Sequence, residues 1–466
     1  MPTTAFERHR PSAAHVEAAL ADTRDATFWI DDAPGERFPK LEGTVEADLA
    51  IVGGGYTGLW TALRAKDRDP DARVVVIEAR RVGWAASGRN GGFVEASLTH
   101  GEENGKRRWP EELEHLDALG MQNLDDIEAT VAREKLRCDF ERTGTLSVAI
   151  EPHEVEWLDK DDDFLDTDQV RAQVNSPTYL AGSWDKRSTA LVHPAKLANE
   201  LARVARERGV IIFENSPVRA LADAASTVSV QTAAGQVRAA RVALATNVFP
   251  SLLKRNRLMT VPVYDYVLMT EPLTSAQLAE IGWTNRQGLA DLANQFHYYR
   301  LSADNRILFG GYDAVYHYGR RVNAAYENRP DTYAKLAGHF FTTFPQLEGL
   351  RFSHRWAGAI DTSTRFCAFY GTARKGRVAY AAGFTGLGVA ATRFAGDVML
   401  DLLAGEKTER TELRMVRERP LPFPPEPAAA LGINATRWSL NQADHREGRR
   451  NILLKALDAV GLGFDS

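Results

Sequence analysis

The sequence predicts an α/β fold (α+β overall) in which a parallel-sheet domain is interleaved with a second domain built on an antiparallel sheet. The apolar residues 48–52 run directly into the glycine-rich stretch GGGYTG, and a second apolar run at 73–77 follows one helix later. Short apolar runs of this kind form the buried strands of parallel sheets. Three further strand-like runs, rich in aromatic residues, lie within residues 256–355 and predict the second sheet.

Length and composition narrow the class of protein. The chain has 466 residues, more than one simple core usually organises, so we expect at least two domains. Acidic and basic residues are interspersed and the net charge is −5, so no nucleic-acid surface is predicted. No run approaches the roughly 18–20 apolar residues of a membrane span. Two cysteines and no export signal favour a cytoplasmic protein without a disulfide framework, and we predict no metal site.

A loop of the pattern G-x-G-x-x-G connects the first strand to the following helix. Gly53 allows the tight turn, Gly55 lets the backbone approach a pyrophosphate, and Gly58 lets the helix pack closely on the strand. The diphosphate then lies at the positive end of the helix. Glu78 follows the second strand, 20 residues past Gly58, where a carboxylate can accept hydrogen bonds from ribose hydroxyls. The combination predicts a Rossmann-like dinucleotide-binding domain.

The stretch RVGWAASGRNGG, soon after that acid, is a second loop of small residues. A nicotinamide nucleotide does not require it, whereas a larger cofactor that continues past its diphosphate needs another close approach of the backbone. Ser87 and Asn90 could supply hydrogen bonds, while Gly88, Gly91 and Gly92 keep side chains out of the way. The alternative interpretation is a flexible surface loop.

These motifs resemble the D-amino-acid oxidase/glycine oxidase/sarcosine oxidase (DAO) family of flavoproteins, and GWAASGRNGG is most similar to its γ-glutamylputrescine oxidase-like branch of amine oxidoreductases. The resemblance covers residue 45 to about 410. It includes a helix and strand over 193–213 followed by Ser-Pro-Val, a strand over 241–247, and a strand over 377–382 that runs into the loop GFTGLGV.

The resemblance implies FAD as the cofactor. In the family, the residue matching Val218 meets the adenine through its backbone, and the strand ending near Thr246 passes the diphosphate. The helix after GFTGLG faces the pyrimidine end of the isoalloxazine, where its dipole stabilises the anionic reduced flavin. The expected cofactor-binding residues are Gly53, Gly55, Tyr56, Thr57, Gly58, Glu78, Ala79, Arg80, Ser87, Gly88, Arg89, Asn90, Gly91, Gly92, Val218, Thr246, Asn247, Gly383, Thr385, Gly386, Leu387, Gly388 and Val389.

The expected FAD-binding domain is discontinuous. The helical stretch at 113–131 is assigned to the substrate domain, and Leu453, Leu457 and Val460 predict an amphipathic helix near the C-terminus. The predicted division is: an N-terminal segment, 1–44; the FAD-binding domain, 45–105, 186–255 and 356–410; the substrate domain, 106–185 and 256–355; and a C-terminal extended connector and helical tail, 411–466.

Aromatic residues are concentrated where the second sheet is expected to cover the flavin. Aromatic faces attract an amine or ammonium ligand through cation–π interaction. Strand alternation lets about half of these residues face the cavity, and the alternative for each is a place in the core. From Tyr264, Tyr266, His297, Tyr298, Tyr299, Tyr316, His317 and Tyr318, we select Tyr264, Tyr266, Tyr299 and His317 as the substrate pocket.

Two departures from the family pattern bear on the substrate and the cofactor. Amino-acid oxidases of the family hold the substrate carboxylate with an arginine at the place of Ile360, which argues against a simple α-amino acid; Arg300 or Arg365 could substitute. The covalent sarcosine oxidases have a cysteine roughly ten residues before Cys367. The FAD is therefore expected to be non-covalent and Cys367 to be a buried thiol.

The resemblance implies oxidation of the C–N bond of a primary or secondary amine. Hydride passes to flavin N5, the resulting imine hydrolyses, and O2 as the electron acceptor is reduced to H2O2. Two alternatives remain open: a flavin dehydrogenase of a hydroxy acid or polyol, and a flavin-bound electron-transfer subunit that needs a partner chain. The sequence leaves the amine, the acceptor and the oligomeric state undetermined.

Overall fold

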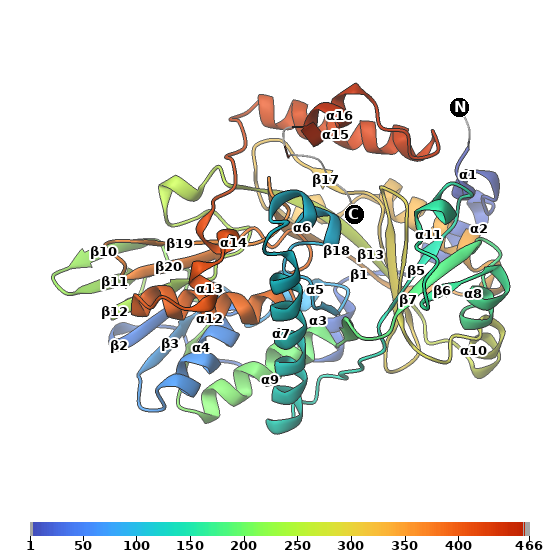
Figure 1. The fold of residues 1–466 in the computed structure, drawn as a ribbon. Helices are drawn as coiled ribbons and strands as arrows, with labels where there is room; N and C mark the ends of the chain where they lie inside the picture. The colour runs from blue at the N-terminus through green and yellow to red at the C-terminus, as the bar shows by residue number, and fades with distance from the viewer. Residues whose placement is uncertain (1–2, 460, 462–466) are drawn as a thin grey trace.

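Two sheets divide the chain into two lobes in the computed structural model, which describes residues 3–459 and 461 (Figure 1). The first is an eight-stranded sheet in the order β10-β11-β12-β2-β3-β9, with β20 beside β12 and β19 beside β20. Its strands are β2 (Gly43–Val52), β3 (Val74–Ile77), β9 (Ile211–Phe213), β10 (Ala220–Ala224), β11 (Thr227–Gln231), β12 (Gly235–Leu244), β19 (Phe369–Ala373) and β20 (Val378–Ala382).

The centre of this sheet is parallel and buried, as the two apolar runs predict. In β2, Ile51 pairs with Val76 of β3 on one side and with Ala243 of β12 on the other, and all three are buried. Three helices pack on this sheet: α4 (Tyr56–Arg68), α9 (Pro194–Glu207) and α12 (Ala391–Ala404). Helix α12 ends at Gly405 in the left-handed conformation (φ 73°), a common glycine C-cap. The predicted fold class is confirmed.

The second sheet is ten-stranded and mostly antiparallel, in the order β1-β18-β13-β16-β15-β14-β5-β7-β6 with β17 on β13. Only the pairs β1–β18 and β14–β5 run parallel among its described pairings. Its strands are β1 (Arg24–Asp25), β5 (Thr145–Ala149), β6 (Phe164–Leu165), β7 (Ala181–Asp185), β13 (Thr260–Thr270), β14 (Gly288–Asp291), β15 (His297–Leu301), β16 (Ile307–Gly311), β17 (Val315–Tyr316) and β18 (Phe352–Ser363).

Helices cover one face of the second sheet, and the core of this lobe lies between those helices and the sheet. The largest is α11 (Pro330–Thr343), whose Phe340 packs against Phe309 of β16 at a ring-centroid distance of 5.7 Å. The helices of this lobe are α1 (Ala5–Arg8), α2 (Ala13–Leu20), α8 (Thr167–Gln173), α10 (Ser275–Ile281) and α11.

The structure differs from the predicted division at two places. Helix α7 (Leu113–Arg133) lies in the first lobe, because its apolar face, including Leu124, joins the core around α12 and Asn123 donates to the Ala390 carbonyl at 2.9 Å. Strand β18 lies in the second sheet, so the boundary predicted at 356 falls inside a strand. Both segments lie where the chain passes from one lobe to the other, and periodicity alone does not show which lobe such an element joins.

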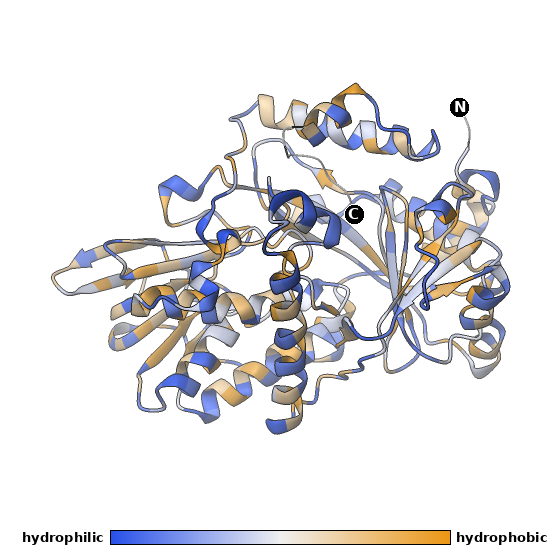
Figure 2. Cartoon of the chain, viewed as in Figure 1, coloured by the Kyte–Doolittle hydropathy of each residue, from blue (hydrophilic) through white to orange (hydrophobic). Residues whose placement is uncertain are grey.

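The connector and tail close the top of the molecule. Residues 420–425 have no regular secondary structure, and 426–427 form a turn. Helices α15 (Ala428–Asp444) and α16 (Ile452–Ala459) lie above the space between the lobes (Figure 1). Both helices are mixed in hydropathy rather than uniformly apolar (Figure 2). Leu454 of α16 is buried, and Leu453 is 37% exposed. Val460, predicted to share the apolar face of this helix, lies outside the described residues. No described helix has the length and apolarity needed to cross a membrane.

The remaining described elements are short. They are α3 (Phe28–Asp32), α5 (Ala86–Arg89), α6 (Glu102–Arg108), α13 (Glu409–Glu412), α14 (Arg414–Arg417), the strand pair β4 (Phe93–Glu95) and β8 (Thr189–Leu191), and 3₁₀ turns at Glu154–Trp157, Lys254–Asn256, Ala324–Glu327 and Pro345–Leu347. Of these, α5 and β4 matter most for function, because they carry the second glycine-rich loop into the space between the lobes.

Candidate active site

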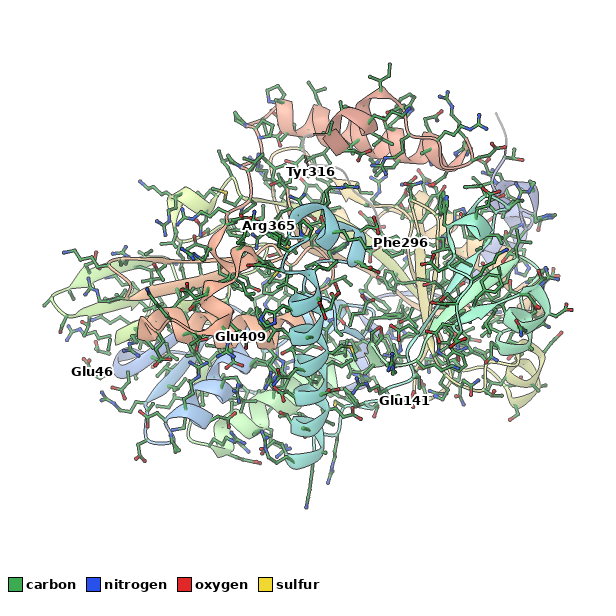
Figure 3. The ribbon with its side chains drawn as sticks, viewed as in Figure 1. Glu46, Glu141, Phe296, Tyr316, Arg365 and Glu409 are labelled. Carbon is green, nitrogen blue, oxygen red and sulfur yellow. The ribbon has the colours of Figure 1, made fainter. Side chains whose placement is uncertain are left out.

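One cavity of about 1330 Å³ lies between the two sheets and is bounded by both lobes and the tail. On the first lobe it is lined by the loop after β2, the end of β3, the loop around α5, the residues after β12 and the loop after β20. On the second lobe it is lined by β13, β18 and the segment 290–298, including Phe296, which is labelled near the middle of Figure 3. A long cavity shared by a dinucleotide-binding sheet and a second sheet is the expected place for cofactor and substrate together.

The glycine-rich loop is packed so tightly that side-chain atoms do not fit. A Cβ added at Gly58 would come within 1.9 Å of the Gly53 carbonyl oxygen, so this glycine sets the contact between α4 and β2. A Cβ added at Gly55 would come within 2.8 Å of Ser87 Oγ and would project into the cavity wall. Gly55 is also the N-cap of α4, whose first N–H groups and dipole favour an anion. The loop therefore has the shape and polarity of a diphosphate cradle.

Glu78 lies buried at the end of β3 and borders the same cavity. Its carboxylate accepts hydrogen bonds from the Gly54 N–H at 2.7 Å, the Arg80 N–H at 2.8 Å and the Trp84 indole N–H at 2.9 Å. Burial raises the pKa of Glu78, and these donors oppose that rise. Because the carboxylate borders the cavity, it is available to a ribose hydroxyl of a bound dinucleotide.

The second glycine-rich loop is held by its own side chains. Ser87 Oγ accepts the N–H of Tyr56 at 2.9 Å, which fixes α5 against the start of α4. The Asn90 amide donates to the carbonyls of Ala86 and Ser87 and accepts the Gly92 N–H at 2.8 Å. Ser87 and Asn90 both border the cavity, but the polar atoms of Asn90 are already used in shaping the loop.

At the other end of the cavity, strand β18 is tied to the loop that precedes α12. Asp361 is buried, and its carboxylate accepts the N–H of Gly383 and the side-chain amide of Asn247, the latter at 3.1 Å. Burial raises the pKa of Asp361 to about 7. Asn247 Oδ1 is buried at the cavity edge and has no hydrogen-bond partner among the described residues. This free acceptor fits a cofactor that presents a hydrogen-bond donor here.

Most of the residues predicted to bind FAD line this cavity. They are Gly53, Gly55, Tyr56, Thr57, Glu78, Ala79, Arg80, Ser87, Arg89, Asn90, Gly91, Val218, Thr246, Asn247, Thr385, Gly386, Leu387, Gly388 and Val389. Four predicted glycines do not line it: Gly58, Gly88, Gly92 and Gly383. Each of these four packs against protein atoms, so an added Cβ would lie 2.9 Å or less from a neighbour. Their contribution is to the shape of the loops rather than to direct contact.

The structure places the four residues selected for the substrate pocket away from this cavity. Tyr264, Tyr266, Tyr299 and His317 are absent from the cavity lining. The cavity-facing residues of β13 are the alternate set, Val261, Val263, Asp265 and Val267. One face of this sheet is covered by helices, and the other faces the cavity between the lobes. Aromatic residues are compatible with either face, so their pattern does not identify which one meets the cavity.

The four misassigned residues belong to the core of the second lobe and its nearby loop. Tyr264 and Tyr266 hydrogen-bond to the backbone of Asn323 and Tyr326, and Tyr299 meets the Tyr179 hydroxyl at 2.7 Å. The His317 ring stacks on the Tyr326 ring at a centroid distance of 3.8 Å. All four are structural aromatics rather than groups that face the cavity.

Several acidic groups that sequence reasoning missed face the cavity, among them Asp265 and Glu95. Asp265 accepts a short hydrogen bond from the hydroxyl of Tyr298, and burial raises the pKa of Asp265 to about 6. Glu95, on β4, forms no side-chain hydrogen bond or ion pair within the described part of the chain. Burial, with a smaller contribution from Asp185, raises the pKa of Glu95 to about 7. Choosing the opposite face of β15 would have identified Tyr298 in place of Tyr299. No local sequence pattern distinguishes Glu95.

Of the residues considered for binding a substrate carboxylate, only Ile360 lies at the cavity. Ile360 lines the cavity, whereas Arg300 and Arg365 do not. Arg300 is buried beside Trp29 and donates to the Val192 carbonyl at 2.6 Å; Arg365 lies over Trp109 and donates to the Glu418 carbonyl at 3.0 Å. Neither arginine substitutes for a clamp at Ile360.

Both cysteines, Cys138 and Cys367, are free, buried and absent from the cavity lining. No cluster of three or more metal-ligating side chains occurs among residues 3–459 and 461.

A Rossmann-like glycine loop and a second lobe that share one cavity define a nucleotide-dependent oxidoreductase with its own substrate-binding sheet. The chain belongs to the DAO family, described as "FAD dependent oxidoreductase", whose sequence model matches residues 48–402. The protein is therefore an FAD-dependent enzyme, and the cradle at Gly55, the acceptor at Glu78 and the free Asn247 oxygen suit that cofactor.

Curated relatives and a solved structure agree with this family. The chain is 31% identical to the gamma-glutamylputrescine oxidoreductase of Escherichia coli over 79% of this chain and 86% of that protein. It is 28% identical to the probable oxidoreductase OrdL of Haemophilus influenzae over 84% of this chain and 89% of that protein. The crystal structure of glycine oxidase from Geobacillus kaustophilus has the same fold, with TM-score 0.64, 19% identity, and 78% and 96% of the two chains covered.

Proposed function

We propose that the protein oxidises the C–N bond of a primary or secondary amine, with non-covalently bound FAD and with O2 as the electron acceptor. The imine formed from the amine hydrolyses to an aldehyde or ketone, and O2 is reduced to H2O2. The bound flavin supplies the hydride acceptor for this chemistry. The protein supplies orientation, exclusion of water and charge around the reacting bond.

The observation that carries this proposal is the unpaired carboxylate of Glu95. Among the acidic residues that line the cavity, Glu78, Asp265, Asp291 and Asp361 each accept hydrogen bonds from named donors. Glu95 alone in this described set accepts none, and it borders the cavity from β4. A partly buried carboxylate without a partner is complementary to an ammonium or amine N–H.

Two further features favour an amine over a simple amino acid. Ile360 presents an aliphatic surface where the family's amino-acid oxidases are expected to hold a carboxylate. The name of the Escherichia coli relative specifies an amine substrate, γ-glutamylputrescine. Since neither cysteine reaches the cavity, the flavin has no thiol available for covalent attachment within the described residues.

Anaerobic reduction of the flavin tests the proposal. The purified holoenzyme is mixed with amines, polyamine derivatives, glycine, sarcosine, D-alanine and hydroxy acids, and bleaching of the flavin absorbance is followed by stopped flow. We expect faster reduction by carboxylate-free or remotely substituted amines than by the simple amino acids, and peroxide once air is admitted. Faster reduction by glycine, sarcosine or D-alanine overturns the Ile360 argument. Reduction by hydroxy acids alone identifies a hydroxy-acid dehydrogenase instead, and no reduction by any donor favours an electron-transfer subunit.

A further inference from the structure

The C-terminal tail supplies a wall of the cavity, although it lies outside the residues matched by the family. The lining residues of α15 include Ala429, Gly432, Ile433, Thr436 and Leu440. Their spacing of three or four places them on one face of the helix, the face directed at the cavity. Helix α16 adds further lining residues. The tail is thus an integral part of the cavity and not a peripheral extension.

The start of α15 is fixed to the second lobe. The Glu426 carboxylate accepts the hydroxyl of Tyr316 and the Gly319 N–H, the latter at 3.2 Å, and caps α15 through the Ala430 N–H at 3.1 Å. Tyr316 lies directly beneath the tail helices (Figure 3). The Arg320 guanidinium also donates to the Pro424 carbonyl.

The end of α15 is fixed to the cavity segment near Phe296. The Asp444 carboxylate accepts the backbone N–H of Asn294 at 2.9 Å and that of Gln295 at 3.2 Å. The Asn441 amide donates to the Gln295 side-chain oxygen at 2.8 Å. With both ends held, α15 presents a fixed set of side chains to the cavity.

One of those side chains is Arg437. Three arginines line the cavity, and two of them are engaged with other groups: Arg80 lies 4.3 Å over the Trp84 ring, and Arg89 pairs with Glu327 at 2.6 Å. Arg437 forms no side-chain hydrogen bond and no ion pair within residues 3–459 and 461. A guanidinium that borders a partly enclosed cavity without an acidic partner is a ready site for an anion.

The charges near Arg437 also favour binding of an anion. Burial, followed by Arg329 and Arg437, lowers the pKa of His317, which places both arginines on the side of that ring. Arg329 contacts only the Thr332 hydroxyl among its described side-chain partners, at 3.3 Å. Glu95, the unpaired acid of the cavity, lies beyond ion-pair distance from Arg437. The cavity therefore offers separate positions for a cation and for an anion.

We propose that Arg437 binds a carboxylate of the substrate, so that the preferred substrate is an amine with its acidic group on another part of the molecule. The inference rests on the proposed amine oxidation and specifies its substrate class. Arg437 determines specificity: it holds the acidic group from the tail, while the amine lies on the side of Glu95. Because Glu95 lies on β4 and Arg437 on α15, we expect a substrate whose amine and carboxylate are separated by a chain to be preferred over an α-amino acid, whose charges are adjacent.

Hexylamine and 6-aminohexanoate provide a matched test, because they share an amine and chain length and differ in the terminal carboxylate. We expect Arg437→Ala to lower kcat/KM for 6-aminohexanoate relative to hexylamine by roughly 10- to 100-fold, through KM, as expected for a lost hydrogen bond to a charged group. Arg437→Lys retains part of the preference. Arg446→Ala, a tail arginine outside the cavity lining, leaves the ratio unchanged. An unchanged ratio in Arg437→Ala overturns the proposal.

A binding measurement separates this proposal from the proposed function. Hexanoate cannot be oxidised as an amine, so its titration into the holoenzyme, followed by the flavin absorbance spectrum, reports carboxylate binding without turnover. We expect a saturable spectral change that Arg437→Ala weakens by at least tenfold and Arg446→Ala does not. If hexanoate binds equally to wild type and Arg437→Ala, or not at all, the proposal fails even when amines are oxidised. If hexanoate binding depends on Arg437 but no amine reduces the flavin, amine oxidation fails instead.

Discussion

The wall of the cavity on the first lobe is made largely of backbone and small residues, whereas the opposite wall is made of side chains. At the first wall, an atom added to Gly55 would come within 2.8 Å of a neighbour, and Glu78 is held by three donors. At the second wall, Val263, Asp265 and Tyr298 project from a sheet into the cavity. The first wall has little room for added atoms, whereas the shape of the second wall depends on which side chains its strands carry. From this difference we expect the first wall to hold the cofactor and the second wall to select the substrate.

The largest expected effect is at the backbone wall. In Gly55→Val, side-chain atoms occupy the space beside Ser87 where the diphosphate must approach, so we expect the protein to purify without FAD. The ratio of flavin to protein absorbance measures occupancy, and circular dichroism measures folding. Gly338→Val is the matched control, because an added Cβ there meets nothing within 4 Å. Full flavin occupancy in Gly55→Val would falsify the placement of the cofactor.

This contrast also separates what the sequence predicts from what it does not. The glycine loop is predictable because its requirements are local: a turn, a close helix and an acid at fixed spacing. The side-chain wall is not, because Tyr264 and Tyr298 differ only in which buried face of a sheet they occupy. Glu95, β18 and Arg437 come from distant segments of the chain and border one cavity only because of the tertiary fold. The parallel sheet and most residues of the first cavity wall are therefore predictable from the sequence, and the side chains of the opposite wall are not.

The next effect is a pH dependence at Glu95. Burial raises the pKa of Glu95 to about 7, so the carboxyl is neutral below pH 7 and becomes an anion above it. Only the anion attracts an ammonium, so we expect kcat/KM for an amine to rise through pH 7 in the wild type, in addition to the rise from the amine's own ionisation. Glu95→Gln removes the step near pH 7 and lowers kcat/KM by roughly 10-fold, the value of one charged hydrogen bond.

The control for Glu95→Gln is Glu46→Gln, which changes an exposed acid on β2. Its pH profile is expected to match the wild type. If the step near pH 7 persists in Glu95→Gln, another group is titrating, and Glu95 is not the residue that meets the amine.

A smaller effect comes from a matched pair of tyrosines on the two faces of the second sheet. Tyr298→Phe removes the hydroxyl that donates to Asp265 inside the cavity, so we expect KM or kcat for amines to change severalfold. Tyr264→Phe removes a hydroxyl that accepts the Asn323 N–H at 2.9 Å in the core. That variant is expected to lose about 1 kcal/mol of stability with unchanged kinetics. Urea unfolding measures the stability of both variants, and steady-state kinetics measures their activity. If Tyr264→Phe changes the kinetics and Tyr298→Phe does not, the substrate meets the strand face that the sequence analysis selected.

The smallest effect is expected at the cysteines: replacing either one should leave the non-covalent binding of FAD unchanged. Cys367 is only 3% exposed and lies outside the cavity lining. Burial raises the pKa of its thiol, so the thiol neither lines the cavity nor ionises readily. Acid precipitation of the wild type is therefore expected to release all of the FAD into the supernatant, and Cys367→Ala and Cys138→Ala are expected to behave identically. A yellow pellet from the wild type that turns colourless in one of these variants would show a covalent bond to that cysteine. It would also show that the backbone wall does not hold the cofactor by non-covalent contacts alone.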